Sequence, residues 1–505
     1  MQALLPDLNR FLPELVLCAG LLLVVIVDSI GAAWRNAVNR LLTVASLLAA
    51  LALCQPLAAA GYSGTLFSGM LVLDPLAVFF KVILLAASLL VVLSFTFRNS
   101  RELAGQGQGE FYALLLAVTF SNLLLATSND LAMLYLALEM VSLTSYIMVA
   151  YIKGDRMSNE ASLKYILFGA VSTGGMLYGL SLLYGMAGTT SMSGIRDFLS
   201  AGLTDQNRFV VYVISLLVFA GFGFKTAVVP FHFWCPDVYQ GAPTPVTAFL
   251  SVAPKAAGFA IMLRFFFSGM ATGGSGPWDL TGSIEWPKIL LVVSVLTMTL
   301  GNVAALTQTN LKRLFAYSSI AHAGYIMMGV VALSENGARA LLIYLLAYLF
   351  MNLGAFLVVT LVHYHDGTFD LRDYPGLYRR APLLTVAMSI FLLSLMGIPP
   401  LVGFMGKLYV FAAIIQKASL LDNGRPLYML AVAGALNAAI AAFYYARILK
   451  TMIIDAGNEE KPPMRLAFAD QLWIVLFVAA NVLPLLWWSR VEAWAQGSLI
   501  LYAGR

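Results

Sequence analysis

The feature that most constrains this chain is a succession of long, continuous apolar runs. A helix needs roughly 20 such residues to cross a bilayer, and reading the runs between charged residues and Gly/Pro breaks predicts about fourteen spans. Because the runs are continuous rather than alternating, they do not fit a transmembrane β-barrel. The sequence therefore predicts an all-α polytopic membrane protein. The predicted spans lie near residues 11–29, 38–60, 69–96, 111–127, 131–151, 164–186, 209–226, 246–268, 288–308, 314–333, 339–362, 382–414, 427–449 and 471–488.

Composition excludes most functions of soluble proteins. Only 11% of the 505 residues are charged, whereas a soluble domain carries about a quarter. The net charge of +5 is scattered along the chain, so it does not form the basic groove of a nucleic-acid-binding protein. None of the three cysteines (Cys18, Cys54 and Cys235) belongs to a CxxC pair, and no glycine-rich nucleotide motif is present. We therefore expect no cofactor and no metal in this chain.

The distribution of lysine and arginine indicates an orientation. Of the 30 cations, 16 lie in or beside loops that follow odd-numbered spans, 10 lie on the opposite side, and four lie within spans. Cytoplasmic loops carry the excess of positive charge. We therefore expect a multi-pass protein of the bacterial inner (plasma) membrane with both termini in the periplasm.

Two of the predicted spans are broken. A proline removes a backbone donor and clashes with the preceding turn, and in lipid such a break survives only where it is buried in protein or lines a wet cavity. We expect these breaks in the seventh and twelfth spans. The residues responsible are Pro230, Pro236, Pro243 and Pro245 in the seventh, and Gly397, Pro399, Pro400, Gly403 and Gly406 in the twelfth.

Ionisable residues within the spans are the strongest functional signal. Glu139 lies in the middle of the fifth span, Lys255 follows Pro254 in the eighth, and Lys225 and Lys407 lie at the two breaks. A charge at the centre of a membrane helix costs about 2.5–3.5 kcal/mol, so these side chains should face protein, water or one another. Lysine changes its charge readily when buried. The pattern predicts a proton-carrying path in which Glu139 partners Lys225.

Other readings of these residues stay open. The buried charges could be structural ion pairs, although helix breaks at two of the lysines favour a function. His322, in the middle of the tenth span, could relay protons or be a satisfied core histidine. His232, after the seventh break, is a weaker candidate for proton access. Lys81 follows Asp74 by seven residues on the same helix face, so it could pair with Asp74 or snorkel to the membrane surface.

A faint internal repeat divides the chain. The fifth span carries Glu139 where the tenth carries Ser318, 179 residues later, and Lys225 and Lys407 are 182 residues apart. We expect two five-helix units, inverted relative to one another because five is an odd number. The predicted parts are N-terminal helices 1–3 (1–110), a first repeat (111–268), a second repeat (269–450) and a last helix (451–505).

Three stretches resemble the antiporter-like subunits of respiratory complex I, and subunit N of NADH–quinone oxidoreductase most closely. They are GFKTAVVPFHFWCPDVYQGAPTPVTAFLSVAPKAAGFA (223–260), ASLKYILFGAVSTGGMLYGLSLLYG (161–185) and LEMVSLTSYIMVAY (138–151). The resemblance implies fourteen helices, two inverted repeats and broken helices 7 and 12. It also implies proton translocation, as part of a translocase enzyme, driven by quinone reduction in other subunits. Those subunits would hold the quinone, FMN and iron–sulfur clusters.

The resemblance also assigns roles residue by residue. Glu139, Lys225, Lys255 and Lys407 match the family's functional residues in helices 5, 7, 8 and 12. A lysine at 407 argues against subunit M, where a glutamate is typical. The implied partners are the antiporter-like M subunit, small K-, J- and A-type subunits, membrane lipids and protons, with no nucleic acid. The alternative is a subunit of an Mrp-type cation/proton antiporter, which shares the fold and the buried lysines.

Overall fold

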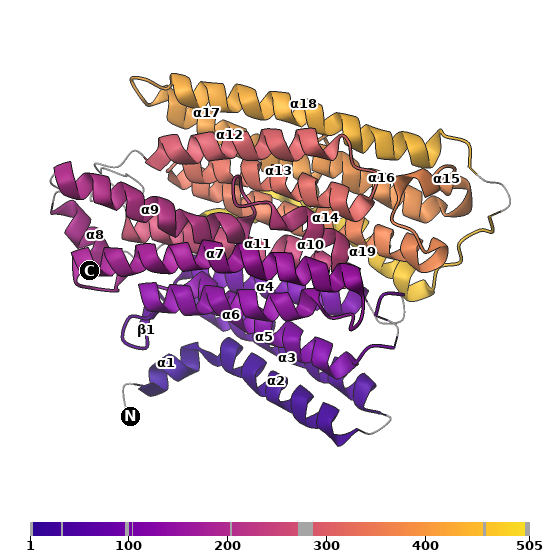
Figure 1. Ribbon diagram of the computed structural model, residues 1–505, viewed down its shortest axis with the longest axis horizontal. Helices are drawn as coiled ribbons and strands as arrows, with labels where there is room; N and C mark the ends of the chain where they lie inside the picture. Colours follow the sequence, from indigo (N-terminus) through magenta and orange to yellow (C-terminus); the bar gives the residue numbers. More distant parts are fainter. Residues whose placement is uncertain are drawn as a thin grey trace.

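Long helices packed side by side make up nearly all of the computed structural model (Figure 1). It describes residues 4–31, 34–95, 100–103, 105–201, 205–270, 286–457 and 461–499. Within these ranges, 13 helices are long and apolar enough to cross a membrane. In the predicted twelfth span the chain forms two helices separated by a break, Pro382–Met396 and Val402–Ser419. The predicted all-α membrane fold is confirmed. Only helices and closed barrels satisfy every backbone polar group in lipid.

The N-terminal helices lie at the lower edge of the molecule in Figure 1. A short antiparallel hairpin precedes the third span and pairs Thr65 with Val72. The predicted start of this span at residue 69 is therefore wrong: the helix begins only after Asp74, whose side chain accepts a hydrogen bond from Ala77 N at 2.7 Å. The elements are α1 (Leu4–Arg10), α2 (Leu12–Ile30), α3 (Arg35–Ala60), β1 (Gly64–Leu66), β2 (Leu71–Leu73) and α4 (Pro75–Ser94).

The central and C-terminal parts follow in two similar series. The first contains α5 (Gln108–Thr127), α6 (Leu131–Val149), α7 (Arg156–Ala187), α8 (Met192–Ser200), α9 (Asp205–Thr226), α10 (Trp234–Gly241), α11 (Thr244–Arg264) and η1 (Phe265–Gly269). The second contains α12 (Trp286–Ala305), α13 (Leu311–Val331), α14 (Glu335–Asp366), η2 (Leu371–Asp373), α15 (Leu377–Arg380), α16 (Pro382–Met396), α17 (Val402–Ser419) and α18 (Arg425–Ile453). The chain ends with α19 (Phe468–Val482), η3 (Leu483–Trp487) and α20 (Trp488–Gly497).

Local geometry supports the predicted repeat. Helices α7 and α14 are both 32 residues long. Asp130 caps α6 and forms an isolated bridge with Ser191, and Asn310 caps α13 and forms one with Asp370. The residue that corresponds to Asn310 is thus Asp130. The same capping role and the same bridge recur at the same place in each series, although the exact division into units stays a prediction.

Both predicted breaks are present. Helix α9 ends at Thr226 and α10 begins at Trp234, and α16 ends at Met396 and α17 begins at Val402. Broken spans 7 and 12 are therefore confirmed. Each break leaves backbone groups without a helical partner, and residues 227–229 of the first break are buried, whereas residues 398–400 of the second are exposed.

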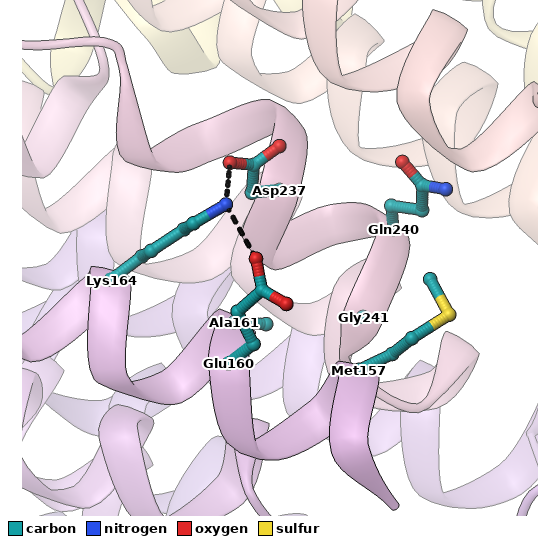
Figure 2. A pocket seen from close by; sticks show the side chains of 7 residues that line it. All are labelled: Met157, Glu160, Ala161, Lys164, Asp237, Gln240 and Gly241. Atoms are coloured by element: carbon teal, nitrogen blue, oxygen red, sulfur yellow. Dashed lines mark hydrogen bonds and ion pairs between the residues drawn. The ribbon is translucent and has the colours of Figure 1, made fainter.

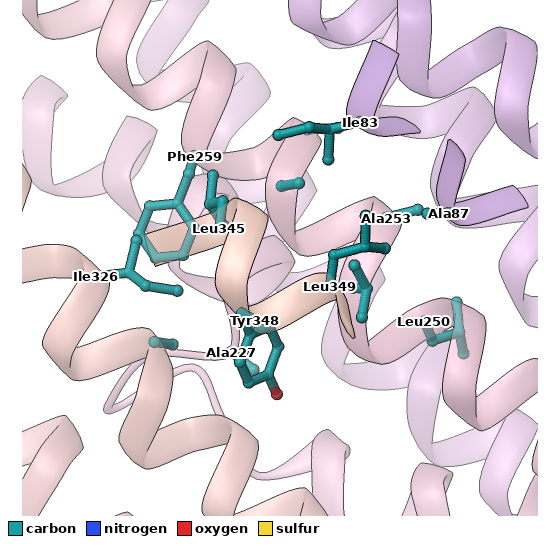
Figure 3. Packing of buried hydrophobic residues seen from close by; sticks show 14 of the residues in the cluster. Ile83, Ala87, Ala227, Leu250, Ala253, Phe259, Ile326, Leu345, Tyr348 and Leu349 are labelled. Carbon is teal, nitrogen blue, oxygen red and sulfur yellow. The ribbon is translucent and has the colours of Figure 1, made fainter. Parts of the chain in front are cut away.

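Helix α11 occupies the centre of the molecule. Every residue of its apolar stretch is buried, and it packs against α4, α5, α9 and α14. Figure 3 shows side chains of several helices meeting around it, including Ile83 of α4, Ile326 of α13 and Leu345 of α14. By contrast, α7 and α18 expose large apolar side chains such as Val171 and Phe443. Lys255, the predicted site residue of α11, therefore lies in the part of the described fold best sealed from lipid.

Candidate functional site

Glu139 and Lys225 come together between α6 and α9. Lys225 is 1% exposed, and its Nζ lies 3.4 Å from the hydroxyl of Ser142, about one turn along α6 from Glu139. The Glu139 carboxylate acts electrostatically on Lys225. Glu139 and Lys225 both lie in the described part of the chain, but no ion pair within 4.0 Å joins them. They form a loose pair in which Ser142 is the direct contact of the lysine.

The first break satisfies its own backbone. The indole Nε1 of Trp234 donates to Phe224 O at 3.0 Å, and Val228 N donates to Gly223 O at 3.0 Å. These carbonyls of the break therefore do not depend on Lys225, whose side chain contacts the neighbouring helices. A Cβ placed on Gly258 would lie 3.3 Å from Lys225 Cγ, so the lysine stem packs on α11, three residues beyond Lys255.

Lys255 connects α11 to α13. Its Nζ donates to Ser319 Oγ at 2.6 Å and lies 5.7 Å from the centre of the Tyr239 ring. Three residues further along α13, His322 is buried, and the charges of Lys255 and Lys407 both act on it. His322 therefore lies electrostatically between the two lysines.

Lys407 is held by the second break itself. Its Nζ donates to Leu395 O at 3.0 Å and to Met396 O at 2.6 Å. These are two of the last carbonyls of α16, where the partial negative charge of a helix collects. The ammonium also lies 4.9 Å from the centre of the Tyr325 ring on α13. Ser318 stands where the first half of the molecule has Glu139, so no carboxylate takes that place in the second half, and the free carbonyls of the broken helix hold Lys407 instead.

The structure thus arranges all five predicted residues in one series. We call Glu139, Lys225, Lys255, His322 and Lys407 the titratable row. Glu139 acts electrostatically on Lys225, and Lys255 and Lys407 act on His322, whereas Lys225 meets the helix of Lys255 through the packing of its stem at Gly258. Four members are buried, and Glu139 is half-buried on the edge of α6. His232, the weaker candidate, lies in the first break and packs against Phe233.

Two buried ion pairs were missed by the sequence reasoning. Lys81 does not pair with Asp74; its Nζ lies 2.7 Å from Glu14 Oε1 on α2, and both side chains are almost fully buried. Asp74 instead binds Arg264 at the end of α11, with contacts of 2.9 and 2.7 Å. Arg264, read from the sequence as a loop cation, is 2% exposed. The unusual position of Glu14 inside an apolar run was the only signal for the first pair.

A network of charges fastens the end of α10 to α7 and α13. Figure 2 shows Lys164 between Asp237 and Glu160, with contacts of 2.7 and 2.9 Å, beside a small cavity of about 110 Å³. Arg313 Nη1 reaches the other oxygen of Asp237 at 2.5 Å. Burial alone would raise the pKa of Asp237, but hydrogen bonds from Lys164 and Arg313 hold it below its usual value. The network fixes the helix that follows the first break.

A second network ties the loop after α4 to α11 and α13. Glu102 accepts from Thr244 N at 2.7 Å and from Lys312 Nζ at 3.0 Å. Burial works against its charge, yet these contacts keep the pKa of Glu102 below its usual value. Lys312 also donates to Ala242 O at 2.6 Å. Both networks position helices of the row without belonging to it.

Groups that could hold a metal were sought in the same residues. Across the ranges given above, no three histidine, cysteine, aspartate or glutamate side chains gather as metal ligands would. The titratable row itself offers amines, a carboxylate and an imidazole, with hydroxyls beside them.

Comparison with known proteins identifies the family. Residues 128–422 match the family described as NADH:quinone oxidoreductase/Mrp antiporter, TM. The chain is 43% identical over 451 residues to NAD(P)H-quinone oxidoreductase subunit 2 of Synechococcus sp. (strain JA-3-3Ab), covering 88% of this chain and 81% of the relative. A chain of respiratory complex I from Thermus thermophilus with bound Aureothin superposes with a TM-score of 0.77 at 30% identity, covering 95% of this chain and 98% of that one.

Likeness to an antiporter complex is limited to the fold. A chain of the Mrp complex from Dietzia sp. DQ12-45-1b superposes with a TM-score of 0.83 at 20% identity, covering 98% of both chains. The sequence is instead 44% identical over 515 residues to NADH-quinone oxidoreductase subunit N of Anaeromyxobacter sp. (strain Fw109-5), covering 98% of this chain and 97% of the relative. The chain therefore belongs to the subunit N family of NADH–quinone oxidoreductase and is a multi-pass membrane subunit of that enzyme complex.

Proposed function

We propose that this subunit translocates protons through the titratable row, driven by quinone reduction in other subunits of the complex. The proposal is carried by the electrostatic contacts within the row, where Glu139 acts on Lys225 and both Lys255 and Lys407 act on His322. Each lysine is nearly sealed from solvent and rests on few contacts, so a change at one group alters the charge balance of the next. A proton can then move stepwise along the series.

The half-buried carboxylate of Glu139 also indicates that another membrane subunit lies beside α6. The face of α6 beside Glu139 exposes Leu136, Met140 and Leu143, and an ionised carboxylate at mid-membrane is costly against lipid. We propose that a neighbouring membrane subunit covers this face. The proposed neighbours in the complex are the antiporter-like M subunit and the small K-, J- and A-type subunits, in the bacterial inner membrane with both termini periplasmic. Quinone, FMN and iron–sulfur clusters would belong to other subunits.

Charge-removing variants test the proposal in the assembled complex. In vesicles, Glu139→Gln and Lys225→Ala should abolish most redox-driven acidification while assembly on a native gel is retained. Lys255→Arg should also slow pumping, because arginine stays charged and cannot release a proton. Glu110→Gln is the control, since Glu110 belongs to an exposed pair. Normal pumping in an assembled Glu139→Gln complex would refute the proposed function.

A further inference from the structure

His322 has a tyrosine hydroxyl at each of its two ring nitrogens. Nδ1 lies 2.7 Å from the hydroxyl of Tyr344 on α14, and Nε2 lies 3.3 Å from the hydroxyl of Tyr445 on α18. The Tyr445 hydroxyl is also 2.5 Å from Ser318 Oγ, one turn earlier on α13. All four side chains are buried. Three helices thus hold one imidazole by both of its polar atoms.

This arrangement satisfies every protonation state of the ring. A neutral imidazole has one N–H donor and one acceptor nitrogen, and a phenol hydroxyl can either donate or accept. When Nε2 carries the hydrogen, it donates to Tyr445, whose own hydrogen points to Ser318, and Tyr344 donates to Nδ1. When Nδ1 carries the hydrogen, both hydroxyls reverse. The imidazolium donates to both oxygens while Tyr445 still donates to Ser318.

Its position on α13 gives the arrangement a use. Ser319, one turn before His322, binds Lys255, and the ring of Tyr325, one turn after, lies beside Lys407. The titratable groups around the imidazole are, from each neighbouring element, Lys255 of α11, Lys407 of α17, Tyr344 and Tyr348 of α14, Tyr445 of α18 and Tyr325 of α13 itself.

We propose that Tyr344 and Tyr445 are positioning residues that let His322 pass a proton from one ring nitrogen to the other. This inference rests on the proposed proton-translocating function. A proton that binds the free nitrogen forms an imidazolium, and the hydrogen on the other nitrogen then leaves, so one N–H bond forms and one breaks. The two hydroxyls then reverse to match the new tautomer. Ser318, which stands where the first half of the molecule has Glu139, hydrogen-bonds the Tyr445 hydroxyl in both neutral tautomers.

Removing single hydroxyls tests the inference. Tyr344→Phe and Tyr445→Phe should assemble, slow redox-driven pumping by about fivefold or more, and shift its pH profile relative to the unaltered complex. Tyr374→Phe is the control: it is equally buried, and its hydroxyl has no hydrogen-bond partner among the described residues. In a His322→Ala background, adding Tyr445→Phe should cause no further loss, because both act through the same ring.

The outcomes separate this inference from the proposed function. Unchanged pumping and pH profile in both tyrosine variants, or an equal loss in Tyr374→Phe, would overturn the positioning role. So would an additive effect in the His322→Ala background, or failure of both variants to assemble. If only Tyr445→Phe fails to assemble, Tyr344→Phe decides alone, because it removes the contact at the other nitrogen. The proposed function stands or falls separately on Glu139→Gln.

Discussion

Loss of either partner of the buried pair between Glu14 and Lys81 should destabilise the N-terminal helices, whereas loss of both should cost little. At a separation of 2.7 Å, an effective dielectric constant of about 20 gives an attraction of about 6 kcal/mol. Desolvation costs several kcal/mol for each ion, so the pair as a whole is close to neutral. Removing one partner leaves the other charge buried alone, which typically costs about 3–5 kcal/mol.

The pair joins α2 directly to α4, two helices that otherwise pack together mainly through α3 and α5. Helix α2 packs mainly on α3 and α5, whereas α4 packs on α3, α5 and α11. Lys81→Met or Glu14→Gln should therefore loosen this group of helices, and the double variant should recover most of the loss. The exposed pair of Lys153 and Glu110, at 3.5 Å, is the matched control, because exposed pairs contribute about 0–1 kcal/mol.

A native thiol reports the opening of these helices. Cys54 on α3 is 1% exposed, so N-ethylmaleimide reaches it only when the helices separate. A cost of about 3–5 kcal/mol predicts labelling roughly 100- to 4,000-fold faster in either single variant. Mass spectrometry of the Cys54 peptide from the assembled complex gives the rate. Wild-type labelling in both single variants, or faster labelling in the double variant than in either, would refute the reasoning.

Two further predictions concern the breaks. Gly397 has φ +84°, and a Cβ there would lie 2.7 Å from Lys407 Cδ. Gly397→Ala should therefore impair pumping. Gly188 has φ +69° and open space around it, so Gly188→Ala should lower the thermal stability through backbone strain without impairing pumping. The pKa of Asp237 is lowered in the folded protein, so its network stabilises the fold fully at pH values above the usual aspartate pKa near 3.8. This stabilisation is lost as the pH falls through the lower pKa of the folded protein. The difference in thermal inactivation temperature between wild type and Asp237→Asn should shrink below about pH 4, and a constant difference would contradict this.

The sequence by itself determined the membrane fold, both breaks and the members of the titratable row. Long apolar runs are costly in water, and prolines and charges at mid-membrane are costly in lipid, so each leaves a clear local mark in the sequence. The hairpin before α4 left no such mark, because strands of three residues are too short to show a period.

Only the tertiary structure decided which groups pair. Glu14 and Lys81, Asp74 and Arg264, and His322 and Tyr445 are far apart in the sequence, and nothing local records their contacts. Asp74 caps the helix that contains Lys81, yet the two residues bind different helices, because packing and not spacing determines the partner. Likewise, the carbonyls that hold Lys407 belong to the backbone of α16. Every residue has such a carbonyl, and only the fold determines which ones are left free to accept a charge.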